Sequence, residues 1–184
     1  TFPDGTALVQ TLTLPAENGR PPRRMETRVL LKQEADWSAY SWLWNEAQTD
    51  AELVPAEGRA VSISGREWSV PSRTQCIMCH ARGANYALGL TAAQLNLDSP
   101  GRGSAVNQLS HFAALGLVKS LPKPPAELPR LANPQDAAAP LPDRIQAYFA
   151  ANCSHCHMHE GGGNSRMDLS PWVTGDAQHL INAV

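Results

Sequence analysis

The chain has 184 residues, a length that suits one domain or two small ones with a buried core. It carries 15 Lys and Arg residues against 17 Asp and Glu residues, a formal net charge of −2, without a long block of like charge. This balance lacks the basic patch typical of nucleic-acid-binding proteins. No run approaches the ~20 apolar residues that span a bilayer. We therefore expect a folded protein that binds no nucleic acid and spans no membrane.

Residues 1–70 are expected to form a β-rich portion. Alternating or aromatic-rich sequence predicts strands over four segments: 6–14, 25–31, 37–44 and 60–70. Prolines and an Asn-Gly pair predict a turn at 15–22, and a second turn at Ser64-Gly65 interrupts the last of these strands. The N-terminal portion is therefore predicted to be a set of hairpins.

The sequence changes character after residue 70. Ser72 is a candidate N-cap for a short helix over the first cysteine pair. Further helices are predicted over three segments: 91–95, 104–118 and 143–157. In the last segment Ile145, Tyr148 and Phe149 form an apolar stripe that runs into the second cysteine pair. Prolines crowd residues 121–142, which predicts an extended connector between the last two helices.

All four cysteines belong to two copies of a C-x-x-C-H motif. The copies are Cys76-Ile77-Met78-Cys79-His80 and Cys153-Ser154-His155-Cys156-His157. This motif attaches haem c covalently, because two thiols one turn apart can bond the same porphyrin while the adjacent histidine binds its iron. A Cys₄ zinc site usually has its pairs ~15–20 residues apart, whereas these pairs are 77 residues apart. Zinc and disulfides remain the alternatives, and a thioredoxin-like pair would not need the duplicated histidine. The sequence predicts two covalent haems, with His80 and His157 as proximal ligands.

The sixth ligands are harder to assign from the sequence. Met167 is the candidate at the second haem, because the ten residues after His157 include a glycine run and extend up to ~33–36 Å. The alternative is that Met167 only fills a gap in the core. At the first haem we predict His111, with Met25, His179 or an open iron as alternatives.

Six segments carry a family resemblance: Glu26–Arg28, Trp44–Ala51, Pro71–Cys76, Gln94–Asn96, Asn107–Leu109 and Asn152–His157. Together they resemble a family of bacterial diheme c-type cytochrome domains. Such domains are often found beside, or fused to, quinoprotein sugar-dehydrogenase-like propellers and other secreted oxidoreductases. The resemblance implies periplasmic or extracellular electron transfer, with the cysteines and histidines of the two motifs holding the haems. It implies a redox protein as partner and leaves the distal ligands open.

The predicted fold class is α+β, with a β-rich N-terminal portion packed on a mainly helical, cytochrome-c-like diheme portion. Its haem units are expected at 71–120 and 143–184, joined by the connector 121–142 within one integrated domain. The predicted function is the relay of single electrons, which makes an enzymatic activity the less favoured interpretation. The alternatives are a small diheme peroxidase and a haem-based gas sensor, both of which need one open iron.

Overall fold

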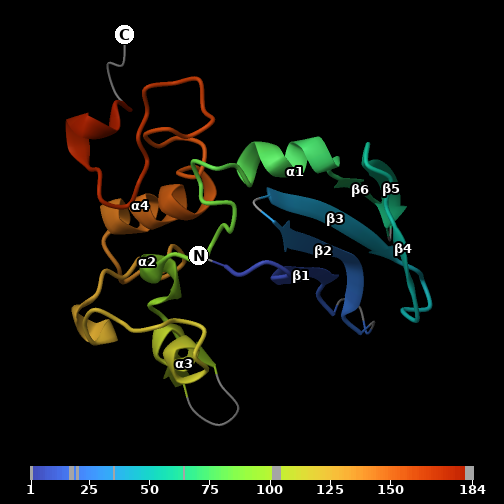
Figure 1. Ribbon diagram of the computed structural model, residues 1–184, viewed down its shortest axis with the longest axis horizontal. Coiled ribbons are helices and arrows are strands. Elements are labelled where there is room, and N and C mark those ends of the chain that lie inside the picture. The colour runs from blue at the N-terminus through green and yellow to red at the C-terminus, as the bar shows by residue number, and fades with distance from the viewer. Residues whose placement is uncertain are drawn as a thin grey trace. The chain divides into compact units, whose positions relative to one another are not determined.

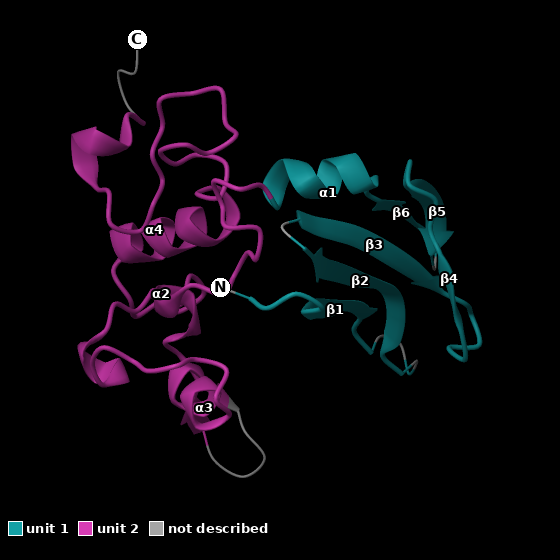
Figure 2. Cartoon of the chain, viewed as in Figure 1, with its two compact units in different colours: residues 1–80 teal, residues 81–184 magenta. Residues whose placement is uncertain are grey.

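Figure 1 shows the computed structural model of the chain, which describes residues 2–16, 19, 21–34, 36–63, 65–100 and 105–180. The chain divides into two compact units, unit 1 over Thr1–His80 and unit 2 over Ala81–Val184 (Figure 2). Among the described residues, no helix combines the length and the apolar character needed to cross a membrane.

Unit 1 is built on a four-stranded antiparallel sheet in the order β1-β2-β3-β4 (Figure 1). The strands are β1 (Ala7–Leu14), β2 (Arg23–Gln33), β3 (Asp36–Trp44) and β4 (Ala51–Leu53). Each strand pairs with the one before it, which makes the sheet a meander. The strands predicted at 6–14, 25–31 and 37–44 are confirmed. The turn predicted at 15–22 includes Glu17, Asn18 and Arg20, which lie outside the described residues.

A β-bulge interrupts the pairing of β1 with β2. Glu26 lies opposite Leu12 and Arg24 lies opposite Thr13, so Met25 has no partner on β1. A bulge disturbs the strict alternation of side chains between the two faces of a sheet. This explains why two consecutive residues, Met25 and Glu26, are both buried.

A second hairpin follows the sheet and leads into the first helix. It consists of β5 (Arg59–Ile63) and β6 (Arg66–Val70), which confirms the prediction of an interrupted strand over 60–70. Ser64, in the predicted turn, lies outside the described residues. Helix α1 (Arg73–Cys79) begins three residues after β6 and packs against β3. The first cysteine pair is therefore held on a helix that the sheet supports.

Unit 2 contains short elements joined by long irregular segments. They are α2 (Ala92–Leu95), β7 (Asp98–Pro100), β8 (Ala105–Asn107), α3 (Gln108–Ala114), α4 (Leu141–Asn152) and two 3-10 turns, Pro125–Glu127 and Gly175–Gln178. Buried Asn96 donates hydrogen bonds to the carbonyl oxygens of Pro125, Leu128 and Pro129 at 2.8, 3.0 and 3.1 Å. These bonds anchor the proline-rich segment inside unit 2.

The predicted fold class is wrong. The described chain is mostly β with four short α-helices, the longest of 12 residues, and it shows no mainly helical, cytochrome-c-like portion. Much of this difference lies in the helices expected over 104–118 and 143–157, which the structure shows as the shorter α3 and α4. The proline-rich segment 121–142, which was predicted to be non-helical, adds only one short 3-10 turn.

Two predicted helices are shorter than expected. In place of a helix over 104–118, α3 covers Gln108–Ala114, because the Asn107 side chain caps it and Gly116 follows with a φ of 71°. Ser104 lies outside the described residues. In place of a helix over 143–157, α4 ends at Asn152, before the second motif.

The apolar stripe of α4 does not coincide with the buried positions of this helix. Ile145 and Tyr148 are 43% and 54% exposed, whereas the buried positions of this helix are Ala147 and Ala150. Alanine has little apolar surface, but its small side chain lets a helix approach its neighbours closely. Hydrophobicity alone therefore does not identify the buried face of this helix.

Candidate functional site

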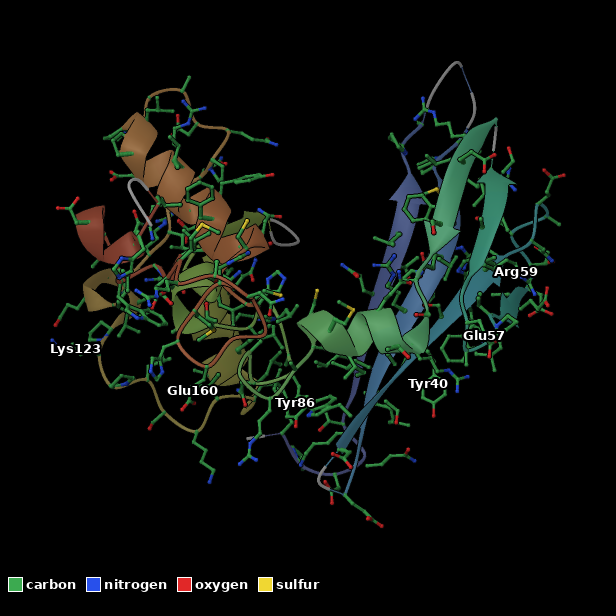
Figure 3. The ribbon with its side chains drawn as sticks, turned by 90° about the horizontal axis from the view of Figure 1, so that it is seen from above. Tyr40, Glu57, Arg59, Tyr86, Lys123 and Glu160 are labelled. Atoms are coloured by element: carbon green, nitrogen blue, oxygen red, sulfur yellow. The ribbon has the colours of Figure 1, made fainter. Side chains whose placement is uncertain are left out.

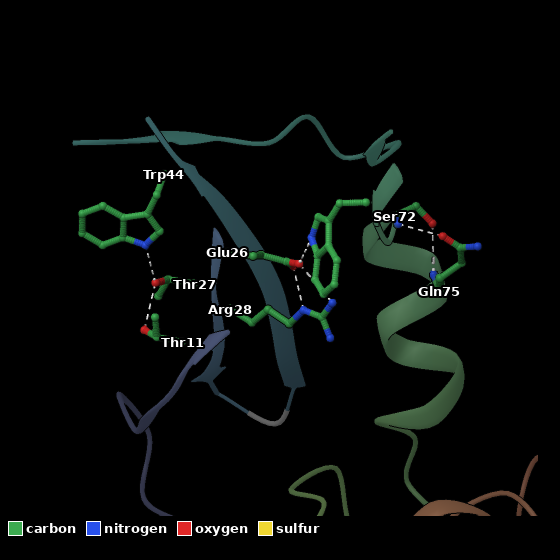
Figure 4. Close-up of polar contacts among 8 residues, drawn as sticks. Thr11, Glu26, Thr27, Arg28, Trp44, Ser72 and Gln75 are labelled. Carbon is green, nitrogen blue, oxygen red and sulfur yellow. Dashed lines mark hydrogen bonds and ion pairs between the residues drawn. The ribbon is translucent and has the colours of Figure 1, made fainter. Parts of the chain in front are cut away.

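The first motif begins in a well-capped helix. The Ser72 hydroxyl accepts a hydrogen bond from the Gln75 N–H at 3.1 Å, and the Gln75 side-chain oxygen accepts one from the Ser72 N–H at 2.8 Å (Figure 4). This reciprocal capping box satisfies two N–H groups that a helix start otherwise leaves unpaired. It fixes the start of α1 at Arg73, three residues before Cys76.

Both motifs close the same backbone turn. The His80 N–H donates to the Cys76 carbonyl oxygen at 2.9 Å, and the His157 N–H donates to the Cys153 carbonyl oxygen, also at 2.9 Å. A bond of this i to i−4 type places residues three apart on one side of the turn. The four cysteines are half-buried thiols. Each motif therefore presents two neighbouring thiols followed directly by an imidazole.

The chain after the second motif folds back onto His157. The Ser165 hydroxyl lies 3.0 Å from His157 Nδ1, and the Leu169 N–H donates to the His157 carbonyl oxygen at 2.8 Å. We call residues 158–169 the return segment. Met167 lies in this segment between its two attachments to His157. A partner at Nδ1 fixes the imidazole and leaves Nε2 as its ligating nitrogen.

Two glycines allow the return segment to lie directly on the motif. A Cβ on Gly163 would lie 2.8 Å from the Cys156 carbonyl oxygen and 3.1 Å from His157 Nδ1, and one on Gly161 would collide with the same carbonyl. Neither glycine has a positive φ. Their role in this structure is therefore close approach to the backbone of the motif.

A buried charge pair lies beside the first motif. Glu26 on β2 is fully buried, and its carboxylate accepts hydrogen bonds from Arg28 Nε at 2.6 Å and Nη2 at 3.1 Å (Figure 4). The Trp68 indole N–H, from β6, donates to the same carboxylate at 3.0 Å. Sequence analysis had named Glu26 and Arg28 only through the family resemblance. A glutamate inside an alternating strand is the signal that could have identified this cluster.

The charge pair acts on the first cysteine. Burial raises the pKa of the Cys76 thiol, Arg28 opposes this rise, and Glu26 and Cys79 add to it. Redox-active C-x-x-C cysteines show the opposite direction, because their pKa is lowered to generate thiolate. Cys76 therefore does not have the electrostatic environment of a thioredoxin-like nucleophile.

The residues between the two cysteines of each motif border hollows. In unit 1, Ile77 and Met78 line an open groove of about 540 Å³ together with two aromatic residues of β3, Trp37 and Tyr40 (Figure 3 labels Tyr40). The Arg73 guanidinium lies 4.6 Å from the centre of the Tyr40 ring.

In unit 2, Ser154 and His155 border a cavity of about 200 Å³, which Met158, Leu131 and Trp172 also line. In both motifs it is these intervening residues, rather than the cysteines, that line the hollow.

The candidate sixth ligands occupy different environments. Met25 is buried at the bulge of β2 in unit 1, the unit that contains His80. His111 is exposed on α3 and His179 is exposed near the end of unit 2. The structure therefore places His111 and the first motif in separate units, while Met167 and the second motif share one.

The donor set fits haem c: each motif supplies two adjacent thiols and an imidazole, and at His157 the ring is already oriented by Ser165. Comparison of the chain with protein-family models, with curated proteins and with solved structures finds no match in any of the three.

Proposed function

We propose that the protein is a diheme c-type cytochrome that relays single electrons. The observation that carries this proposal is the shared turn of the two motifs, in which the histidine N–H binds the carbonyl oxygen of the first cysteine at 2.9 Å. The motifs lie in unlike surroundings and nevertheless form the same turn. Because these two motifs use every cysteine in the chain, a shared chemical role explains both.

Cys76 and Cys79 would hold one haem, with His80 as its proximal ligand. Cys153 and Cys156 would hold the other, with His157 as its proximal ligand. When bound, the haems supply one-electron exchange at iron. The protein's contribution is to fix the imidazoles: with Nε2 directed to iron, His157 Nδ1 carries the proton and donates to the Ser165 hydroxyl.

Met167 is our proposed sixth ligand for the second haem. Ser165 and Leu169, which lie on either side of Met167 in the sequence, both hydrogen-bond to His157. These two bonds hold the segment that contains Met167 against the second motif. A thioether ligand favours ferrous iron over a second imidazole, so we propose the higher potential for this haem.

For the first haem we propose His111, with Met25 as the competing ligand. Substitution of His111 by alanine separates the two, because it creates a high-spin component only if His111 is bound.

The proposed partner is a redox protein of the periplasm or the extracellular space, such as a quinoprotein dehydrogenase or another secreted oxidoreductase. The family resemblance in six segments of the sequence supports this choice. The compartment is proposed because haem c is attached to reduced thiols after export, and the finished protein works outside the cytoplasm.

Intact mass under denaturing conditions tests the proposal. Protein made with an export signal and the cytochrome c maturation machinery should exceed the mass of the bare chain by two haems. The same chain kept in the cytoplasm should be colourless. A single haem, or tightly bound zinc in place of haem, would refute the proposal. Carbon monoxide binding to the ferrous wild-type protein, combined with peroxide turnover, would favour the peroxidase instead, and carbon monoxide binding alone would favour the gas sensor.

A further inference from the structure

The Glu26–Arg28–Trp68 cluster joins the four-stranded sheet of unit 1 to the hairpin that follows it. Glu26 and Arg28 lie on β2 with Thr27 between them, and Thr27 points to the other face of the sheet, where its hydroxyl accepts from the Trp44 indole N–H at 2.9 Å. Trp68 lies on β6, two residues before the end of the strand that leads into α1. The cluster therefore lies on the sheet face nearest α1, as Figure 4 shows.

Burying a carboxylate is costly unless it is paired and hydrogen-bonded. Glu26 meets this condition with three bonds, at 2.6, 3.1 and 3.0 Å, two of them from one guanidinium. The bidentate geometry fixes the direction of the Arg28 side chain. Arg28 itself remains 36% exposed, and it uses only part of its five N–H donors on Glu26.

We propose that Arg28 supplies a fixed positive charge beside the Cys76 tether of the first haem and raises the potential of that haem, and that Glu26 is the positioning residue that holds Arg28 in place. This inference rests on the proposed function, because it requires haem at the first motif. At the second motif it is a neutral hydroxyl, that of Ser165, that contacts His157.

The sign follows from electrostatics. A nearby positive charge disfavours the additional positive charge of ferric iron and so stabilises the ferrous state. The Glu26 carboxylate opposes this effect. Removing either member should therefore shift the potential, in opposite directions.

Spectroscopic redox titration of the holoprotein tests the inference with three variants. Arg28→Gln should lower one of the two midpoints, by roughly a threefold to tenfold change in the ferrous-to-ferric ratio at fixed potential. Arg28→Lys keeps the charge and should restore most of that midpoint. Glu26→Gln keeps an acceptor for Trp68 and should raise the same midpoint. Arg59→Gln is the matched control, because Arg59 forms an ion pair with exposed Glu52 in the same unit (Figure 3).

Opposite shifts in Arg28→Gln and Glu26→Gln, with Arg59→Gln unchanged, support the inference, because simple loosening of the fold would not reverse sign. Unchanged midpoints in protein that carries two haems would overturn it and leave the proposed function intact. An equal shift in Arg28→Lys and Arg28→Gln would also overturn it. If Glu26→Gln fails to fold, the two Arg28 variants decide. Absence of haem from the first motif in wild-type protein would instead refute the proposed function.

Discussion

The two C-x-x-C-H motifs form the same turn but are held in different ways. The first lies at the end of a capped seven-residue helix that packs on a β-sheet, above a buried glutamate–arginine pair. The second follows the end of α4 and is enclosed by a return segment that bonds to the histidine ring and carbonyl. The five residues of the motif thus determine the local turn, whereas its surroundings depend on residues far along the chain.

This difference matters for the proposed chemistry. In our proposal, the surroundings of the first motif act through charge, and those of the second act by orienting the imidazole that would bind iron. Two centres with the same tether can thereby acquire different potentials, which gives an electron relay a direction.

The largest expected effect is the loss of one haem at a time. In a Cys76→Ala/Cys79→Ala variant the first haem has no thioether bonds, and in Cys153→Ala/Cys156→Ala the second has none. Each double variant should retain one covalent haem in its denatured mass, and the four-cysteine variant none. Loss of both haems from either double variant would show that the motifs do not act independently.

Substitution of Met167 distinguishes the motifs at the level of the sixth ligand. Met167→Ala should abolish a near-red sulfur-to-ferric charge-transfer band and lower one midpoint by on the order of 0.1 V, within the ~0.8 V that axial ligands span. Met78→Ala is the control, because Met78 lies inside the first tethering turn and is 66% exposed. A band that survives in Met167→Ala would assign the ligand elsewhere, with Met25 next.

The support beneath α1 can be tested at a glycine. Gly58 has a φ of 81°, and a Cβ there would lie 2.5 Å from the Val70 carbonyl oxygen and 2.8 Å from the Ser72 nitrogen. Gly65 has a similar φ of 75° but open space around it, so Gly65→Ala measures the backbone strain alone. Gly58→Ala should lower the free energy of unfolding by about 1–3 kcal/mol more than Gly65→Ala in urea titrations. Equal losses would mean that the turn before β5 does not constrain α1.

The hydrogen bond to the second proximal histidine predicts a smaller effect. Ser165→Ala removes the acceptor for His157 Nδ1–H, which makes the imidazole a weaker donor to ferric iron, so one midpoint should rise. The associated loss of stability should be about 1 kcal/mol. Ser154→Ala is the control within the same motif, because its hydroxyl donates to the Ala150 carbonyl oxygen. A midpoint that stays fixed in Ser165→Ala would show that this contact does not influence the iron.

The parts of the molecule that local sequence determines were predicted well. Alternation identified the first two strands and aromatic content the third, and the Ser72 cap and both motif turns depend on residues within five positions of one another. The remaining features depend on distant partners: Trp68 reaches a carboxylate 42 positions away, and Asn96 holds carbonyls 29 to 33 positions away. Periodicity cannot reveal such partners. It also extended the last helix to residue 157, whereas α4 ends at Asn152.

The smallest expected effect is a pH dependence specific to the return segment. The pKa of Asp168 is lowered below its ordinary value of 3.8, mainly by a hydrogen bond from the Ser170 side chain. Burial opposes this shift, whereas backbone hydrogen bonds from Ser170 and His159 and the charge of His159 add to it. The Ser170 N–H also donates to Asp168 Oδ1 at 3.0 Å. Because the folded pKa is lowered, this carboxylate contributes stability above the unfolded value, and the contribution is lost as the pH falls through the folded pKa.

Hydrogen exchange of the return segment should therefore accelerate as the pH is lowered below about 4, after correction for the intrinsic rate, with an effect below about 1 kcal/mol because Asp168 is largely accessible to solvent. Asp168→Asn keeps an oxygen acceptor for the Ser170 N–H but removes the charge. It should therefore abolish only the acceleration of hydrogen exchange at low pH. Asp136→Asn is the control, because Asp136 accepts from the Ala138 N–H at 2.9 Å in a similar turn outside the return segment. An acid transition that persists unchanged in Asp168→Asn would assign it to another group and leave the enclosure of the second motif independent of this carboxylate.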